Sequence, residues 1–97
     1  MQKQIEKLIF EALKNVGDEL ENENLKNPNL ETKIYGTGGE LDSLSLVSFI
    51  ADLEQMLSSL GIDIVLADER TMSARNSPFK DVATLTQYIL NRGQENG

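Results

Sequence analysis

The chain has 97 residues, of which 39% are hydrophobic and 26% are charged, a composition typical of one globular domain. Sixteen acidic residues against nine basic ones give a net charge of −7, which argues against binding to nucleic acid or to an anionic membrane surface. The chain has no cysteine and no histidine, so it lacks a thiol nucleophile, thiolate ligands and the commonest general base. We expect a single domain over 1–97, with a core over about 5–90, and no metal site.

The first twenty residues are expected to form an amphipathic helix. Its apolar residues recur at steps of three and four and are Ile5, Leu8, Ile9, Ala12, Leu13, Val16 and Leu20. Gly17 weakens this helix, which therefore ends there or continues to about Glu23. The start, Met1–Phe10, is charged and does not look like a signal-peptide core, and no apolar run approaches the roughly 20 residues of a membrane span. We therefore expect a cytoplasmic protein that does not bind membranes.

A long loop is expected between the first and second helices, over Asn22–Gly39. The segment is rich in Asn, Gly and Glu, contains Pro28, and offers three apolar anchors, which are Leu25, Leu30 and Ile34. Its glycine-rich end, Tyr35–Gly39, lacks the full dinucleotide-binding fingerprint and a preceding strand. We interpret these glycines as giving the loop freedom to swing into Ser43.

A second helix is expected to begin after this loop, with Asp42 or Ser43 as its N-cap. Apolar residues at helical spacing then continue to Gly61, a candidate C-cap, and are Leu44, Val47, Ile50, Leu53, Met56, Leu57 and Leu60.

The last third of the chain is expected to hold an extended segment and two further helices. Ile62, Ile64 and Leu66 alternate, but they have no partner strand, so they indicate an extended segment anchored in the core. Leu66–Met72 is expected to form a short helix. Asp81 is expected to cap a last helix with a polar, frayed tail from Arg92, and its inward-facing residues are Val82, Leu85, Tyr88 and Ile89. The fold class is all-α, with three main helices and one short helix in a bundle.

Ser43 is the residue whose side chain is best placed for a chemical modification. The N-terminus of a helix has unpaired N–H groups and a positive dipole end, which stabilise a phosphate ester by roughly 0.3–1 kcal/mol. If Asp42 takes the cap, the Ser43 hydroxyl is free to point outward. Taken alone, a Ser or Asp before an apolar helix is most often only a helix cap.

The residues around Ser43 resemble a known modification motif. The string Leu41-Asp42-Ser43-Leu44, with Val47 following, resembles the Asp-Ser-Leu motif of acyl and peptidyl carrier proteins. Further resemblances to this family lie at Gly61-Ile62-Asp63-Ile64 and at Phe79-Lys80-Asp81-Val82 with Leu85 and Tyr88-Ile89. The likeness covers roughly Ile5 to Leu90, in the family's order of helices and loops.

The resemblance implies a four-helix carrier-protein bundle that is not an enzyme. A phosphopantetheinyl transferase would attach 4′-phosphopantetheine from coenzyme A to Ser43, between Asp42 and Leu44. The thiol of this arm would carry an acyl or aminoacyl group as a thioester between acyl-loading and acyl-accepting enzymes. A cofactor thiol agrees with the lack of cysteine, and we expect the carrier to be a monomer.

The resemblance also implies two surfaces. The candidates for an apolar groove that shelters the cargo are Val47, Ile50, Leu53, Ile64 and Leu85, each of which is equally compatible with ordinary core. The candidates for partner docking on the second helix are Ser45, Val47, Ser48, Asp52 and Glu54. Fatty-acid carriers usually have an acidic docking face, whereas Ser45 and Ser48 are neutral. We therefore expect a dedicated carrier in a specialised lipid, polyketide or peptide pathway.

One segment is open to two interpretations, and two other classes of protein are alternatives to a carrier. The Val65–Pro78 segment is longer than in the family, and it is either a tolerated surface insertion or a docking element. An enzyme is disfavoured because the chain has no histidine and nothing in the sequence places a lysine beside Ser43 to act as a general base. The main alternative is a helical protein-interaction module in which Ser43 only caps a helix.

Overall fold

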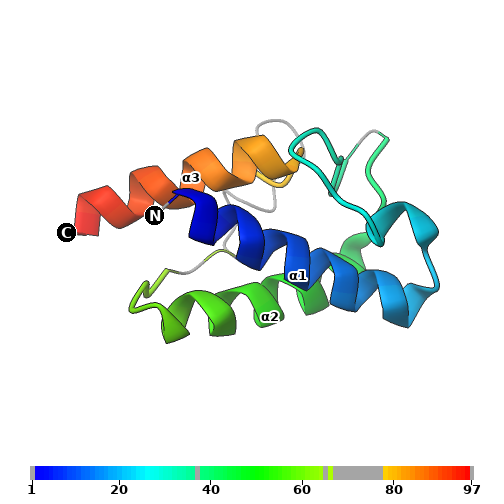
Figure 1. Cartoon of the computed structure of the whole chain (residues 1–97), viewed down its shortest axis with the longest axis horizontal. Coiled ribbons are helices and arrows are strands. Elements are labelled where there is room, and N and C mark those ends of the chain that lie inside the picture. Colours follow the sequence, from blue (N-terminus) through cyan, green and yellow to red (C-terminus); the bar gives the residue numbers. More distant parts are fainter. Residues whose placement is uncertain (1, 37, 65, 67–77, 97) are drawn as a thin grey trace.

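The computed structural model describes residues 2–36, 38–64, 66 and 78–96. Within these ranges the elements are α1 (Gln2–Leu20), the short 3-10 helix η1 (Glu23–Leu25), α2 (Ser43–Ser59) and α3 (Val82–Asn96), with no strand (Figure 1). The all-α class is therefore confirmed, with three α-helices in the described ranges. The predicted short helix at Leu66–Met72 lies outside the described residues, apart from Leu66.

Helix α1 packs against both α2 and α3 and forms the centre of the fold. Its buried apolar residues follow the expected stripe and are Ile5, Ile9, Ala12, Leu13 and Val16. Leu20 is an exception, because its side chain is 47% exposed at the end of the helix. The helix continues past Gly17, and Glu21 then adopts a left-handed conformation with φ of 55°. The Asn22 N–H donates to the Gly17 carbonyl oxygen at 2.8 Å, which satisfies an end carbonyl of α1.

Helix α2 buries only part of the apolar set that the sequence shows at helical spacing. The inward-facing apolar residues are Leu46, Phe49, Ile50, Leu53 and Leu57. Of the residues at the predicted spacing, Ile50, Leu53 and Leu57 are buried. The side chains of Leu44, Val47 and Leu60 are instead 82%, 53% and 39% exposed. The helix is apolar over much of its circumference, so its spacing fits more than one inward face. Gly61 is confirmed at the C-terminal end, with φ of 83° and the Ile62 N–H donating to the Leu57 carbonyl oxygen at 2.9 Å.

The long loop before α2 is tied to the segment that leads into α3. The Ile34 and Tyr35 N–H groups donate to the carbonyl oxygens of Lys80 and Phe79, at 3.1 and 2.9 Å. An isolated antiparallel bridge joins Lys33 to Asp81 in the same region (Figure 1). The loop is therefore anchored to the bundle by its backbone.

Two of the three predicted apolar anchors of this loop are confirmed. Leu25 and Ile34 are fully buried, whereas Leu30 is 42% exposed and is not an anchor.

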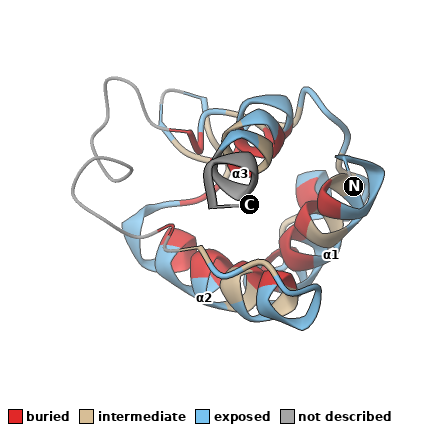
Figure 2. Ribbon diagram, turned by 90° about the vertical axis from the view of Figure 1, so that its left-hand side faces the viewer, coloured by how far each residue is buried: buried red, intermediate tan, exposed pale blue. Residues whose placement is uncertain are grey.

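The last helix begins where the sequence places it. The Asp81 carboxylate accepts the Thr84 N–H at 2.7 Å, which confirms Asp81 as the capping residue. The expected residues face inward, with Val82, Leu85 and Ile89 buried and Tyr88 partly buried, and Figure 2 shows the buried sides of the helices directed at one another. The helix continues to Asn96, and fraying of its polar end from Arg92 stays a prediction.

The segment after α2 also agrees with the prediction. Ile62 and Ile64 are partly buried against the core and Leu66 is fully buried, as expected of an extended, core-anchored segment. No helix in the described ranges has the length and apolar character needed to cross a membrane.

Candidate functional site

The start of α2 is closed by a reciprocal cap between Asp42 and Ser45. The Asp42 Oδ1 atom accepts the Ser45 N–H at 2.9 Å, and the Ser45 Oγ atom accepts the Asp42 N–H at 3.0 Å. This is a capping box, with Asp42 as the N-cap residue. The hydrogen bonds from the backbone and the side chain of Ser45 hold the pKa of Asp42 below its ordinary value of 3.8.

Ser43 follows this cap as the first residue of α2. Its side chain is exposed, and its hydroxyl makes no hydrogen bond with the described part of the chain. A capping serine would instead use its oxygen to accept an early N–H of the helix. Because Asp42 fills that role, the hydroxyl of Ser43 is left facing solvent at the positive end of the helix.

The glycine-rich segment forms a tight turn on the approach to Ser43. The Gly39 N–H donates to the Gly36 carbonyl oxygen at 2.9 Å, and the Leu41 N–H donates to the Ile34 carbonyl oxygen at 2.9 Å. A Cβ atom on Gly39 would lie 2.6 Å from the Cα atom of Tyr35, so only glycine fits there. The glycines therefore allow close packing of the turn, and Gly36 and Gly38 have positive φ angles of 95° and 79°. That they also give the loop freedom to swing stays a prediction.

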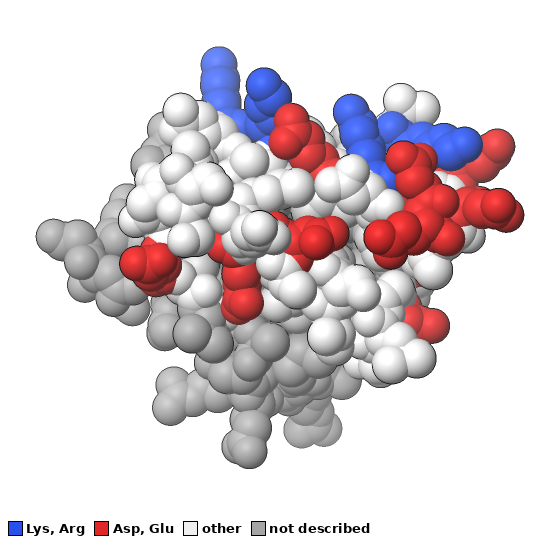
Figure 3. Space-filling view, turned by 90° about the horizontal axis from the view of Figure 1, so that it is seen from below, with Lys and Arg blue, Asp and Glu red and all other residues white. Residues whose placement is uncertain are grey.

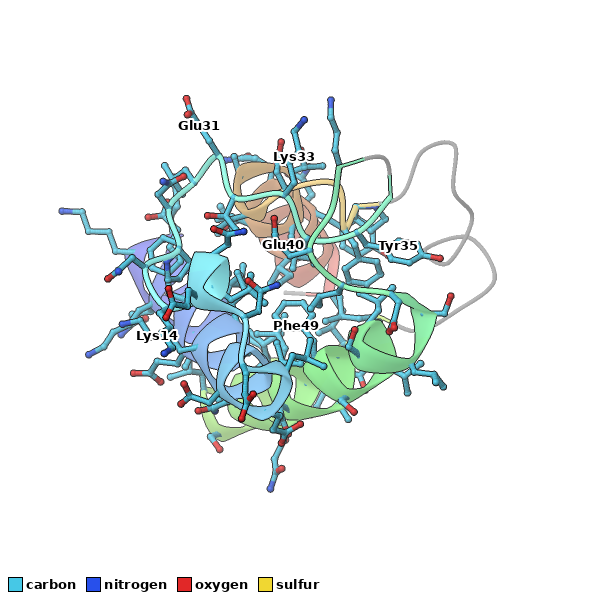
Figure 4. The ribbon with its side chains drawn as sticks, turned by 90° about the vertical axis from the view of Figure 1, so that its right-hand side faces the viewer. Lys14, Glu31, Lys33, Tyr35, Glu40 and Phe49 are labelled. Atoms are coloured by element: carbon cyan, nitrogen blue, oxygen red, sulfur yellow. The ribbon has the colours of Figure 1, made fainter. Side chains whose placement is uncertain are left out.

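Glu40 makes a contact that the sequence does not predict. Its Oε1 atom accepts hydrogen bonds from the Nδ2 atoms of Asn22 and Asn24, at 3.0 and 3.2 Å. Figure 4 shows Glu40 directed toward the body of the molecule, whereas Glu31 on the same loop points outward. The segment before Ser43 is thereby joined to the connection between α1 and η1.

An exposed apolar surface lies beside Ser43. Leu44 and Val47 are three residues apart on α2 and therefore share one side of the helix, which we call the Leu44–Val47 patch. Ser48 is also exposed and follows Val47 directly. Figure 3 views the molecule from the side of α2, where uncharged side chains lie among acidic ones, which gather at the right-hand end, and the basic side chains lie along the upper edge.

The remaining predicted docking residues occupy different settings. Ser45 is only 8% exposed and its side chain is engaged in the cap, so it has little surface to present to a partner. The Glu54 Oε2 atom accepts the Leu66 N–H at 2.6 Å, which anchors the segment after α2. Asp52 is partly exposed. Val47, Ser48 and Asp52 are therefore the docking candidates whose side chains are accessible.

The five predicted groove residues do not share one accessible surface. Ile50, Leu53 and Leu85 are enclosed in the core, Ile64 is partly buried, and Val47 points outward. The shelter for a cargo stays a prediction. Among the described residues, no three acidic side chains come together in a way that could hold a metal ion.

Comparisons of the chain with protein-family models, with curated proteins and with solved structures find no match. The chemistry that the site can support therefore follows from its geometry. An unpartnered primary hydroxyl stands at a helix N-terminus, flanked by a carboxylate that is committed to the cap and by an exposed leucine. This arrangement suits a hydroxyl that an external enzyme converts into a phosphate ester.

Proposed function

We propose that the protein is an acyl-carrier-type protein whose Ser43 is the attachment point for 4′-phosphopantetheine. The observation that carries the proposal is the division of roles at the start of α2. Asp42 caps the helix, and Ser43 keeps a free, exposed hydroxyl. Asp42 occupies the N-cap position, which argues against the alternative in which Ser43 is only the helix cap. The Asp-Ser-Leu string and its surroundings supply the second support.

The attachment reaction needs little from this chain beyond presentation of the hydroxyl. The Ser43 Oγ atom would form a bond to the phosphorus of the phosphopantetheine part of coenzyme A. The bond from that phosphorus to the adenosine 3′,5′-bisphosphate would break, and the hydroxyl proton would pass to the transferase. The resulting phosphodiester would lie at the positive end of α2, which stabilises it. Once attached, the arm supplies a thiol that holds an acyl or aminoacyl group, so the chain acts as a carrier and not as an enzyme.

The Leu44–Val47 patch supports partner docking through apolar and neutral contacts. Exposed apolar side chains beside a modification site suit an enzyme that closes over the serine. The neutral, exposed residues Val47 and Ser48, which follow Ser43 on α2, support a dedicated carrier in a specialised lipid, polyketide or peptide pathway. The partners are then a phosphopantetheinyl transferase and the enzymes that load and accept the acyl group, and we place the protein in the cytoplasm as a monomer.

The test is the intact mass of the purified protein before and after incubation with coenzyme A and a broad-specificity phosphopantetheinyl transferase. We expect a gain of one phosphopantetheinyl group in the wild-type protein and none in Ser43→Ala. Ser58→Ala is the matched control, because Ser58 is also an exposed serine of α2, near the opposite end of the helix, and it should gain the group normally. A folded wild-type sample that gains nothing with several transferases would contradict the proposal.

A protein-interaction module is the second candidate function. It is favoured by the exposure of Leu44 and Val47, which is independent of any modification. In that case the Leu44–Val47 patch binds a partner directly, and Ser43 carries no arm. The mass experiment separates the two functions.

A further inference from the structure

Glu40 differs from the exposed acidic residues of the same loop in having a structural partner. Its carboxylate is partly buried and receives two side-chain amide groups on one oxygen atom. Glu31 is exposed, and only its backbone N–H makes a hydrogen bond, to the side chain of Asn29. Figure 4 shows the two carboxylates pointing in different directions. Since an ionised carboxylate only accepts hydrogen bonds, two amide donors are well matched to it.

The two amide groups come from a fixed part of the molecule. Asn22 is the N-cap of η1, and its Oδ1 atom accepts the Asn24 N–H at 2.9 Å. Asn22 is also held to the end of α1 by its own N–H. The donors are therefore oriented before they meet Glu40, which lowers the entropy cost of the contact.

The other end of the contact lies next to the candidate modification site. Glu40 is two residues before the cap residue Asp42 and directly after the glycine turn. Glycine-rich backbone loses much conformational freedom when it is ordered. A side-chain tether at Glu40 opposes that freedom at the point where the chain enters α2.

We propose that Glu40 is a positioning residue, which holds the approach to Ser43 in one conformation through Asn22 and Asn24. This inference rests on the proposed carrier function. A transferase then meets the Ser43 hydroxyl in one orientation relative to the Leu44–Val47 patch. Loss of the tether leaves the hydroxyl chemically unchanged but less often in the productive orientation.

The experiment compares the kinetics of arm attachment in four proteins, which are the wild type, Glu40→Ala, Glu40→Gln and Glu31→Ala. Glutamine keeps an oxygen that accepts the amide hydrogen bonds, whereas alanine removes it. Glu31→Ala removes the same charge from the same loop without breaking a side-chain hydrogen bond. We expect Glu40→Ala to lower kcat/KM for arm attachment roughly tenfold, and the other two variants to stay within about twofold of the wild type.

Amide hydrogen exchange of the unmodified proteins tests the tether without any modification. We expect Glu40→Ala to raise the exchange rates of the Leu41, Ser45 and Leu46 amides, while the core amides of α3 keep theirs. A uniform rise over the whole protein would instead show general destabilisation and would overturn a positioning role. Unchanged exchange in Glu40→Ala, or a kinetic loss in Glu40→Gln as large as in Glu40→Ala, would also overturn it.

Failure of the proposed function gives a different result. If the wild-type protein takes no arm, the carrier function fails, and with it the role of Glu40 in attachment. The exchange measurement would then still decide whether Glu40 orders the start of α2.

Discussion

A Cβ atom placed on Gly17 would lie 2.6 Å from the Cβ atom of Leu25. The end of α1 therefore packs directly on η1, and this contact leaves no room for a side chain at Gly17. In the sequence Gly17 looks like a weak point of the helix, but in the structure its small size lets the two elements meet.

Gly17→Ala should therefore destabilise the protein, although alanine favours helices more than glycine. We expect the clash to lower the free energy of unfolding by about 1–3 kcal/mol, more than the helix propensity returns. Urea unfolding followed by circular dichroism measures this. Asn15→Ala is the control, because it raises helix propensity at an exposed position of α1 and should leave stability equal or slightly higher.

At Glu21, by contrast, a substitution should raise the stability of the protein. It has a φ of 55° directly after α1, a conformation in which glycine is less strained than glutamate. We expect Glu21→Gly to raise the free energy of unfolding by about 0.5–1 kcal/mol. Glu19→Gly is the control inside α1 and should lower it by about 1 kcal/mol. A loss of stability in both variants would contradict the strain at Glu21.

The cap between Asp42 and Ser45 should make stability depend on pH in the acid range. The pKa of Asp42 is lowered in the folded state, so its carboxylate stabilises the fold above its ordinary pKa of 3.8. This contribution is lost as the pH falls below 3.8 and through the folded-state pKa.

Urea unfolding of the wild type and of Asp42→Ala tests this dependence at about pH 7 and about pH 3. We expect the variant to be less stable at the higher pH and the difference to shrink at the lower pH. Asp63→Ala, which removes an exposed carboxylate after α2, should show no comparable change. A difference that stays constant down to low pH would rule out the ionised cap as its source.

Substitution of Glu54 can separate its structural role from its predicted docking role. Its carboxylate accepts the Leu66 N–H at 2.6 Å. We expect Glu54→Ala to lower the free energy of unfolding by about 1–2 kcal/mol, because the Leu66 N–H loses a charged acceptor in a partly buried setting. Asp52→Ala, on the same helix, should change stability by less than about 0.5 kcal/mol. If Glu54→Ala leaves stability intact but slows arm attachment, Glu54 serves docking instead.

Leu44 and Leu46 form a matched pair for testing the Leu44–Val47 patch. Leu44→Ala should change stability by no more than about 0.5 kcal/mol, because its side chain is 82% exposed. Leu46→Ala should cost about 2–5 kcal/mol, because Leu46 is fully buried. The carrier proposal further expects a raised KM of the transferase for Leu44→Ala. An unchanged KM would remove the patch from transferase docking.

Much of the fold could be predicted from local patterns. Most of the stripe of α1, the cap at Asp81 and the turn at Gly61 depend on residues close together in the sequence, and these were confirmed. The inward face of α2 could not be predicted in the same way. Leu44 with Val47 and Leu46 with Phe49 both fit helical spacing, and only packing against α1 selects the second pair.

In the candidate site, too, local features could be predicted and long-range contacts could not. Helix-end chemistry narrows the cap of α2 to Asp42 or Ser43, and the structure selects Asp42 and leaves Ser43 exposed. The contact of Glu40 with Asn22 and Asn24 could not be predicted, because it depends on how the loop folds back on α1. The backbone bonds from Ile34 and Tyr35 to Lys80 and Phe79 could not be predicted either, because they join distant parts of the sequence.

The backbone bonds between the long loop and the start of α3 also govern when Ser43 reaches its final setting during synthesis. The Val82 and Ala83 N–H groups donate to the carbonyl oxygens of Thr32 and Leu30, far earlier in the chain. Contacts between such distant segments close large loops, so they form only after the later segment has been made. A nascent chain that has released Ser43 from the ribosome but not yet Val82 presents the serine on an unfinished scaffold. The completed chain, and not the growing one, is therefore the form in which the start of α2 is fully assembled.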